Sequence, residues 1–407
     1  MIRALYLHVP FCAARCRYCD FATAATRAGD PVMPAYADAL ERLVGEARSL
    51  GLTEGLATAY VGGGTPSLLA PPDLARLMEA AAGAGAAPLR ELSFEANPES
   101  FGADTLAAAV GAGATRVSIG VQSFDDGELR ALGRIHSAKR AAAAVAAAVG
   151  SGLSTSVDLM CGIPYQTPAS WERSLERAVS LGVAHVSCYP LIIEEGTAME
   201  RLCEEGRLPW PDDDTEAGAM EAAERVLFGA GLARYEVASY ARPGAACAHN
   251  IAYWTGVEYL GLGTGAASML SREGYEALRL AVPGLPAAAE GTARLRLTVA
   301  STTAAIAQAR SLADLTFEVE ELDRREAAAE DLMLALRMAA GAGPRAIARA
   351  RGAIPAAALD AALIWADEAG LARWADGEGG ASLAPTERGW LMGNELYGRF
   401  WDLAHDE

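Results

Sequence analysis

The sequence is almost without lysine: Lys139 is the only one in 407 residues, so arginine carries nearly all of the positive charge. Acidic residues outnumber basic ones, 52 against 34, and the formal net charge is −18. An acidic surface repels phosphate backbones, and no basic patch stands out, so we expect no nucleic-acid partner. Aromatic residues make up only 7% of the chain, but 52% of it is hydrophobic, which excludes a disordered or fibrous protein.

The sequence also lacks a hydrophobic run that is long enough to span a bilayer. The longest uncharged stretch, 141–157, is mostly alanine and is interrupted by glycine and serine. The first residues contain one arginine and a strand-like run rather than a signal peptide, so we expect a cytoplasmic protein whose membrane contact is at most peripheral, through a partner. The seven cysteines do not indicate a disulfide framework, because their number is odd and the chain is long.

Short apolar runs alternate with stretches of helical period over the first half of the chain. The predicted strands span 4–9, 58–62, 91–96, 116–121, 155–160 and 185–193. The predicted helices span 36–50, 73–82, 104–111, 138–150 and 168–181. Alternating strands and helices predict a parallel sheet covered by helices, and a partial or full β/α barrel fits best. A doubly wound open sheet is the alternative, although no G-x-G-x-x-G follows the first strand.

The pattern changes after residue 232. Predicted strands at 235–240, 259–262 and 295–299 are followed by predicted helices at 324–339, 344–352 and 355–369 and by a hairpin at 372–383. We therefore divide the α/β chain into a barrel core (1–232), a mixed strand and loop segment (233–312) and a small, mostly helical, winged-helix-like C-terminal domain (313–407). The acidity of this last domain argues against DNA binding and favours a packing appendage or a docking surface.

Three cysteines, Cys12, Cys16 and Cys19, lie within FCAARCRYCDF, directly after the first predicted strand. Zinc usually takes four ligands in two pairs, and no second pair follows. Three thiolates on one tight loop suit a [4Fe–4S] cluster with one iron left open, whereas a loop that only packs or binds zinc weakly is the alternative. GGGTP at 62–66 follows the second strand, where glycines allow the backbone to approach a small polar ligand.

The cysteine loop and GGGTP together resemble the signature of the radical S-adenosylmethionine (SAM) superfamily. The resemblance implies a β/α barrel with a [4Fe–4S] cluster whose open iron binds SAM, and one-electron cleavage of SAM to a 5′-deoxyadenosyl radical. Further segments are similar to the oxygen-independent coproporphyrinogen III oxidases and their HemW-type relatives. These are FEANPES (94–100), RVSIGVQSFDD (116–126), LGRIHS (132–137), SVDLMCGIPYQT (156–167), YEVASYARPG (235–244), HNIAYW (249–254) and YLGLGTGAAS (259–268).

By this resemblance the three cysteines bind the cluster, and nine further residues contact SAM. Most of the nine lie at or just past the C-terminal end of a predicted strand, where barrels collect their functional groups. Their carboxylate, amide, guanidinium and backbone groups match the polar groups of SAM, and two tyrosines would lie near the cluster and the adenine. They are Tyr6, Tyr18, Gly63, Gly64, Thr65, Glu95, Gln122, Arg134 and Asp158.

Two functions share this scaffold: a chaperone that binds haem and delivers it to haemoproteins, and an oxidase that decarboxylates coproporphyrinogen III. Three features favour the chaperone. Phe21 stands where the decarboxylases carry a fourth cysteine, we expect no N-terminal arm to close over a substrate, and the H-N-x-x-Y-W motif of the chaperone branch is present. A SAM-dependent haem methyltransferase or haem-opening enzyme is a more distant alternative.

His249 in this motif is the predicted haem ligand, because histidine is a common ligand of haem iron and its aromatic neighbours suit a flat macrocycle. Cys247 is a rival ligand, and a packed, hydrogen-bonded histidine is the structural alternative. One departure concerns a family motif that usually reads G-A-H-S. This chain has Ala267 in place of the histidine, so any role of that side chain is missing or moved. Cys203 is predicted to lie in an exposed helix.

Overall fold

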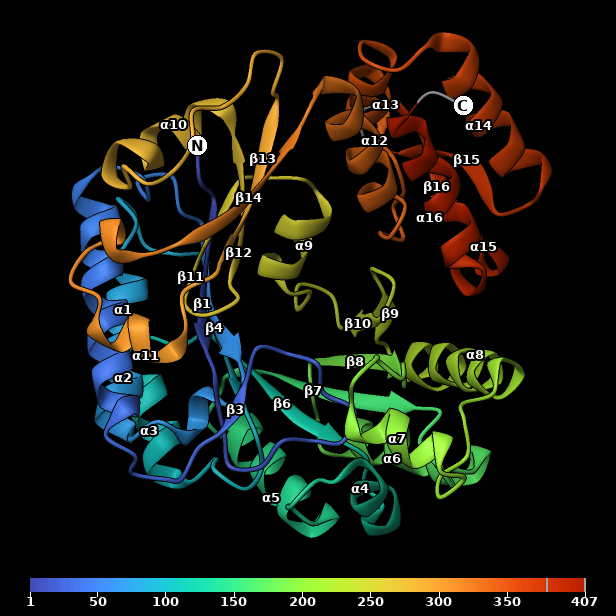
Figure 1. The fold of residues 1–407 in the computed structure, drawn as a ribbon. Coiled ribbons are helices and arrows are strands. Elements are labelled where there is room, and N and C mark those ends of the chain that lie inside the picture. The colour runs from blue at the N-terminus through green and yellow to red at the C-terminus, as the bar shows by residue number, and fades with distance from the viewer. Residues whose placement is uncertain (378–379, 406–407) are drawn as a thin grey trace.

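The fold is built around one large sheet. The structure is a computed structural model that describes residues 1–377 and 380–405 (Figure 1). Seven neighbouring strands are parallel, and most of their residues are buried, as expected for a sheet with both faces covered. In sheet order they are β11 (Tyr259–Leu262), β1 (Ala4–Val9), β4 (Thr58–Gly63), β5 (Glu91–Ala96), β6 (Arg116–Gln122), β7 (Ser154–Cys161) and β8 (His185–Pro190).

Antiparallel strands extend the sheet at both ends. β10 (Ser239–Ala241) and β9 (Ala233–Arg234) follow β8, and β12 (Ala267–Ser271), β13 (Arg294–Val299) and β14 (Phe317–Leu322) follow β11. The sheet order starts at β14 and ends at β9, so the barrel is partial rather than closed. Segment 233–312 shares this sheet with the strands before it, and the division of the chain at residues 232 and 312 stays a prediction.

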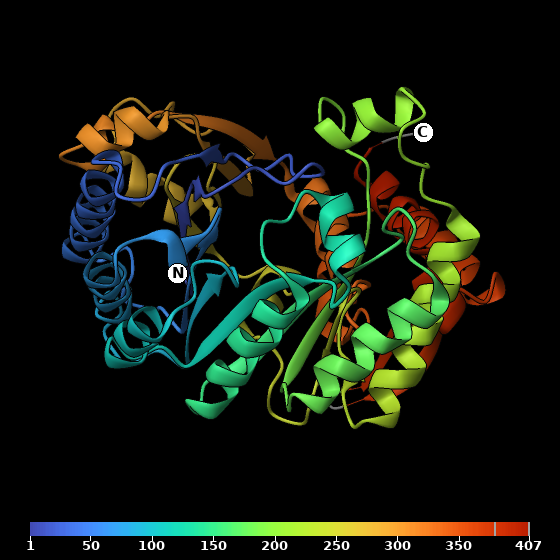
Figure 2. The same ribbon diagram turned by 90° about the horizontal axis from the view of Figure 1, so that it is seen from below.

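Helices cover the outer face of the curved sheet, as Figure 2 shows from below. The buried side chains of each helix form one stripe, such as Leu40, Leu43, Val44 and Ala47 of the first helix, which packs against the strands. The helices of this layer are α1 (Val32–Ser49), α2 (Pro71–Ala82), α3 (Ala103–Gly111), α5 (Ala138–Gly150), α6 (Pro168–Ser180) and α8 (Asp213–Gly229). Shorter elements are β2 (Phe11–Cys12), β3 (Ala24–Ala25), α4 (Asp126–Leu132), α7 (Ala198–Glu204), α10 (Arg272–Ala281) and α11 (Thr303–Gln308).

The last eighty residues form a second, smaller hydrophobic core that lies to one side of the sheet (Figure 1). Its elements are α12 (Arg324–Ala335), α13 (Pro344–Arg351), α14 (Ala356–Glu368), β15 (Ala372–Gly377), β16 (Gly380–Pro385), α15 (Glu387–Leu391) and α16 (Gly393–Trp401). We call these elements the C-terminal module. The short helix α9 (Ala248–Trp254), which carries the HNIAYW motif, lies between the sheet and this module, and Trp254 stacks under the guanidinium of Arg337.

The structure confirms the fold class and most predicted elements, and it corrects two strands and the exposure of one cysteine. The strand predicted at 185–193 ends at Pro190, because the apolar residues after it pack into a separate small cluster. The strand predicted at 235–240 is wrong, since only Ser239–Ala241 pair in the sheet and Glu236 forms an isolated bridge with Met338. Cys203, predicted to be exposed, is buried in the same small cluster. Among the described residues, no helix is both long and apolar enough to cross a membrane.

Candidate functional site

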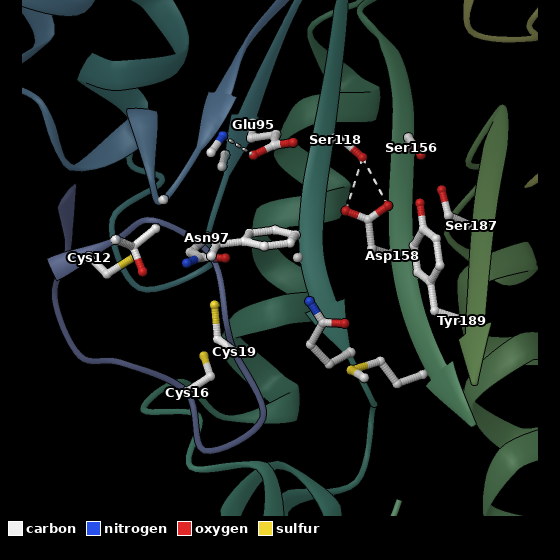
Figure 3. Close-up of a pocket in the computed structure, with 18 of the residues that line it drawn as sticks. Cys12, Cys16, Cys19, Glu95, Asn97, Ser118, Ser156, Asp158, Ser187 and Tyr189 are labelled. Atoms are coloured by element: carbon white, nitrogen blue, oxygen red, sulfur yellow. Dashed lines mark hydrogen bonds between the residues drawn. The ribbon is translucent and has the colours of Figure 1, made fainter. Parts of the chain in front are cut away.

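A cavity of about 630 Å³ lies between the strands of the sheet and the loop that carries the three cysteines (Figure 3). All of the predicted site residues line it except Thr65, which is buried behind Cys12. The loop follows β1, and Glu95 and Asp158 project into the same space from β5 and β7. The sheet therefore brings together residues from positions 6 to 253 in one polar cavity.

Cys12, Cys16 and Cys19 line one side of the cavity, and two polar side chains reach their sulfur atoms. The Thr65 hydroxyl donates to Cys12 Sγ at 3.6 Å, and Arg134 Nη1 donates to Cys16 Sγ at 3.3 Å. Burial raises the pKa of the Cys12 and Cys19 thiols, so binding a metal cluster would release protons. Hydrogen-bond donors beside thiolates fit an iron–sulfur cluster, whose reduction potential such bonds tune.

The three cysteines do not converge on one point. In the described part of the chain, no group of three or more His, Cys, Asp or Glu side chains is placed to hold a single metal ion. A cubane cluster needs no such convergence, because each of three irons takes its own thiolate. The donor set and its spacing on the loop fit a cluster with one open iron.

The backbone at Gly63 and Gly64 cannot carry side chains. Gly63 has φ +109°, and a Cβ atom there would lie 2.5 Å from the His8 ring; at Gly64 it would lie 2.7 Å from the carbonyl oxygen of Phe11. The backbone of this turn consequently packs tightly beside the cysteine loop and still faces the cavity. The Gly63 N–H donates to Glu95 Oε2 at 2.9 Å.

Glu95 and Asp158 are two buried carboxyl groups, and within residues 1–377 and 380–405 neither has a cationic partner at salt-bridge distance. Tyr60 donates to Glu95 at 3.0 Å, and Ser118 lies 3.1 Å from both oxygens of Asp158. Burial raises the pKa of Glu95 to about 7, helped by the charge of Asp158, and burial raises the pKa of Asp158 to about 6. Both carboxylates are thus available to hydroxyl or ammonium groups of a ligand, which would restore their ordinary pKa.

Arg134 and Gln122 lie where β6 ends. Arg134 Nη2 donates to Asn97 Oδ1 at 2.7 Å and to the Gly120 carbonyl at 2.6 Å, so its guanidinium is fixed in place. Gln122 has φ +65°, and the pairing of β6 with β7 shifts register just before it, which turns the strand end toward the cavity. Asn97, whose amide also donates to Thr65 at 2.8 Å, was not predicted, although it lies within FEANPES.

The two predicted tyrosines line the cavity near the cysteine loop. The hydroxyl of Tyr6 lies 3.1 Å from His8 Nδ1, and His8 Nε2 lies 3.2 Å from the carbonyl of Ala22, which ties the first strand to the end of the loop. Tyr18 lies between the last two cysteines and packs against the small cluster around Met160. Burial raises the pKa of both phenols, so they remain neutral.

His249 lies at the opposite end of the cavity and is buried. Its Nδ1 is 2.9 Å from the Thr58 hydroxyl, its Nε2 is 3.0 Å from the Tyr253 hydroxyl, and its ring stacks on Tyr60. Burial lowers its pKa to about 4. Because both ring nitrogens have partners, binding to haem iron would require the ring to give up one hydrogen bond. Its role as a haem ligand stays a prediction.

This inner end of the cavity contains residues that the sequence did not single out. Arg116 and His185 begin β6 and β8, and Ser156 Oγ lies 2.7 Å from His185 Nδ1. Burial lowers the pKa of His185 to about 3, so the ring is neutral. Barrel sites collect their functional groups at the C-terminal ends of strands, whereas Arg116 and His185 lie at N-terminal ends, where the sequence gives no signal for a site.

Known proteins resemble this chain in sequence and in fold. The model of the Radical SAM superfamily matches residues 6–178. The haem chaperone HemW of Bacillus subtilis is 30% identical over 406 residues, which cover 98% of this chain and 99% of the relative. The chain belongs to the HemW haem chaperone family. HemW of Mycobacterium tuberculosis (strain H37Rv) is 43% identical over 265 residues, covering 64% of this chain and 68% of the relative.

The family relation also fixes the class of cofactor and the fold. Radical SAM proteins use a [4Fe–4S] cluster and SAM, and the superfamily match includes the cysteine loop and the glycine turn. Among solved structures, coproporphyrinogen III oxidase (HemN) of Escherichia coli, described as a radical SAM enzyme, has a TM-score of 0.75 and 21% identity. That match covers 98% of this chain and 90% of the oxidase and shows that the two share a fold.

Proposed function

We propose that the protein is a haem chaperone that binds haem and delivers it to haemoproteins. The observation that carries this proposal is the similarity to the Bacillus subtilis HemW over nearly the whole of both chains, including the C-terminal module. Phe21, with 61% of its surface exposed, stands at the cavity where a decarboxylase of this group would carry a fourth cysteine. The partners that accept the haem are haemoproteins.

We infer in addition the roles of the residues in the cavity. Cys12, Cys16 and Cys19 hold the cluster, and SAM binds between the glycine turn and the ends of β5, β6 and β7. A bound cluster with SAM supplies one-electron chemistry at this site. The chain's own groups orient SAM. The backbone at 63–64 and the carboxylates of Glu95 and Asp158 contact the polar groups of SAM. Arg134, which is hydrogen-bonded to Cys16 and Asn97, holds the cysteine loop against β6.

The decisive experiment is an anaerobic titration of the cluster-reconstituted protein with haem, followed by absorption spectroscopy and then by transfer to an apo-haemoprotein. We expect stoichiometric binding with a shifted Soret band, and recovery of the acceptor's own spectrum after mixing. Absence of haem binding, together with decarboxylation of coproporphyrinogen III in the presence of SAM and a reductant, would instead identify an oxidase.

A further inference from the structure

The inner end of the cavity lies far from the cluster and the glycine turn. Arg116 is the first residue of β6 and Gln122 is its last. A strand rises about 3.3 Å per residue, so this end lies roughly 20 Å from the edge at which the cysteine loop begins. The interiors of β/α barrels are normally filled by branched apolar side chains. A polar hollow at the N-terminal ends of the strands therefore indicates a second use of the cavity.

Arg116 is the first sign of that use. Its side chain is only 5% exposed, its Nε donates to Glu91 at 3.3 Å, and its Nη2 donates to the carbonyl of Ala245. Its Nη1 is buried and has no hydrogen-bond partner within residues 1–377 and 380–405. A buried charged donor without an acceptor costs free energy, so a ligand that supplies an acceptor to Nη1 would stabilise the folded protein.

Asn250 is the second sign. It is the second residue of the HNIAYW motif, and it lines the cavity. It follows Ala248 and His249, whose backbone N–H groups donate to Glu91, the ion-pair partner of Arg116. His249 and Tyr253 of the motif are hydrogen-bonded to each other, whereas the side-chain amide of Asn250 has no partner among the residues that the structure describes. The amide group carries two N–H donors.

We propose that the inner end of the cavity binds a single carboxylate group through Arg116 Nη1 and the Asn250 amide. A carboxylate accepts several hydrogen bonds at once, and its bond to a guanidinium is charge-assisted. Glu91 already balances most of the charge of Arg116, which favours one negative charge over the two of a phosphate. The carboxylate is either a haem propionate, which rests on the proposed function, or belongs to a small free acid.

Haem and haem dimethyl ester distinguish the first source, because the ester has the same macrocycle without carboxylates. If a propionate occupies the subsite, the full-length protein binds the ester at least tenfold more weakly than haem. The variant Asn250→Asp, which places a negative charge beside the ligand, then weakens haem binding by about the same factor and leaves ester binding unchanged. The matched control is Asn394→Asp, which makes the same change at an exposed position of the C-terminal module.

Thermal unfolding with and without millimolar succinate or propionate tests the second source. A rise in Tm for the wild-type chain and Asn394→Asp, absent from Asn250→Asp and from Arg116→Lys, would assign the subsite to a small acid. Equal binding of haem and its ester, with no effect of either acid on Tm, would overturn the proposal. If haem itself does not bind, the proposed function fails, and the Tm arm alone decides the subsite.

Discussion

At the scale of single residues, the two buried carboxyl groups make the ligand-free protein sensitive to pH. Burial raises the pKa of Glu95 from 4.5 to about 7, so the folded chain holds this proton more tightly than the unfolded chain does. The stabilisation is complete below pH 4.5 and is lost as the pH rises through about 7. Asp158 adds to the same trend with a window that ends near pH 6.

Glu95→Gln removes the larger part of this dependence. We expect the free energy of unfolding of the ligand-free variant to fall by roughly 2 kcal/mol less than that of the wild type between pH 4.5 and 7. Urea unfolding at a series of pH values measures the difference. Glu79→Gln, on the exposed face of α2, should retain the wild-type slope. Identical slopes for both variants and the wild type would show that Glu95 ionises freely.

His249→Ala separates packing from haem ligation. The variant leaves Thr58 and Tyr253 without their partner and opens a cavity, so we expect a loss of about 2–4 kcal/mol of stability. If the ring is also the haem ligand, the Soret band of the haem-bound variant shifts. Tyr253→Phe removes the hydrogen bond between residue 253 and His249 Nε2 but keeps the His249 ring, and it should preserve the wild-type spectrum. An unshifted band in His249→Ala would remove the ligand role.

Residue-level prediction succeeded where a motif implied a position and failed where only the fold creates one. Cys12 and Glu95 lie in motifs, and both line the cavity. Asn97 lies in one of the same motifs, but only its hydrogen bond from Arg134 makes it part of the site. Arg116 and Asn250 line one cavity although more than a hundred residues of sequence separate them, and no local pattern predicts this.

At the scale of elements, the turn after β4 has little freedom to change. Gly63→Ala would place a Cβ 2.5 Å from the His8 ring at a φ of +109°, and it would push the turn away from the cysteine loop. We expect SAM to bind the cluster-reconstituted variant at least tenfold more weakly, as measured by equilibrium dialysis. Gly111→Ala, where a Cβ meets open space at the end of α3, should bind SAM normally.

Elements were predictable where burial follows one period. The strands 4–9 and 91–96 and the helix 138–150 have the predicted bounds. The two strands are buried on both faces and the helix is buried along one face, so each shows a clear apolar pattern in the sequence. α4 was missed, since its seven residues are too few to display a period; it is set instead by the cap that Asp125 provides. The strand prediction failed past Pro190 because an apolar run identifies burial but not the partner that buries it.

At the scale of the whole molecule, a buried ion-pair network joins the C-terminal module to the sheet. Arg294 on β13 contacts Glu330 and Asp331 on α12 at 2.7 Å each, and the half-exposed Arg349 contacts Asp331 at 3.1 Å from the rim of the network. Removing one partner of a buried network leaves the others uncompensated, which costs more than the attraction of an exposed pair.

Asp331→Asn should therefore loosen the C-terminal module. We expect a loss of about 3 kcal/mol and earlier proteolytic release of a C-terminal fragment, followed by calorimetry and timed digestion. Arg225→Met, which breaks an exposed pair with Glu172, should change stability by less than about 1 kcal/mol. A digestion time course like that of wild type would show that apolar contacts alone hold the module.

The place of β1 in the sheet has a consequence for synthesis on the ribosome. β1 pairs on one edge with β4, which emerges early, and on the other with β11, which emerges about 200 residues later. At about 5–20 residues per second, one edge of the first strand stays open for roughly 10–40 seconds during translation. Open strand edges are templates for aggregation, so we expect chaperones that bind the nascent chain during this interval to raise the yield of folded protein.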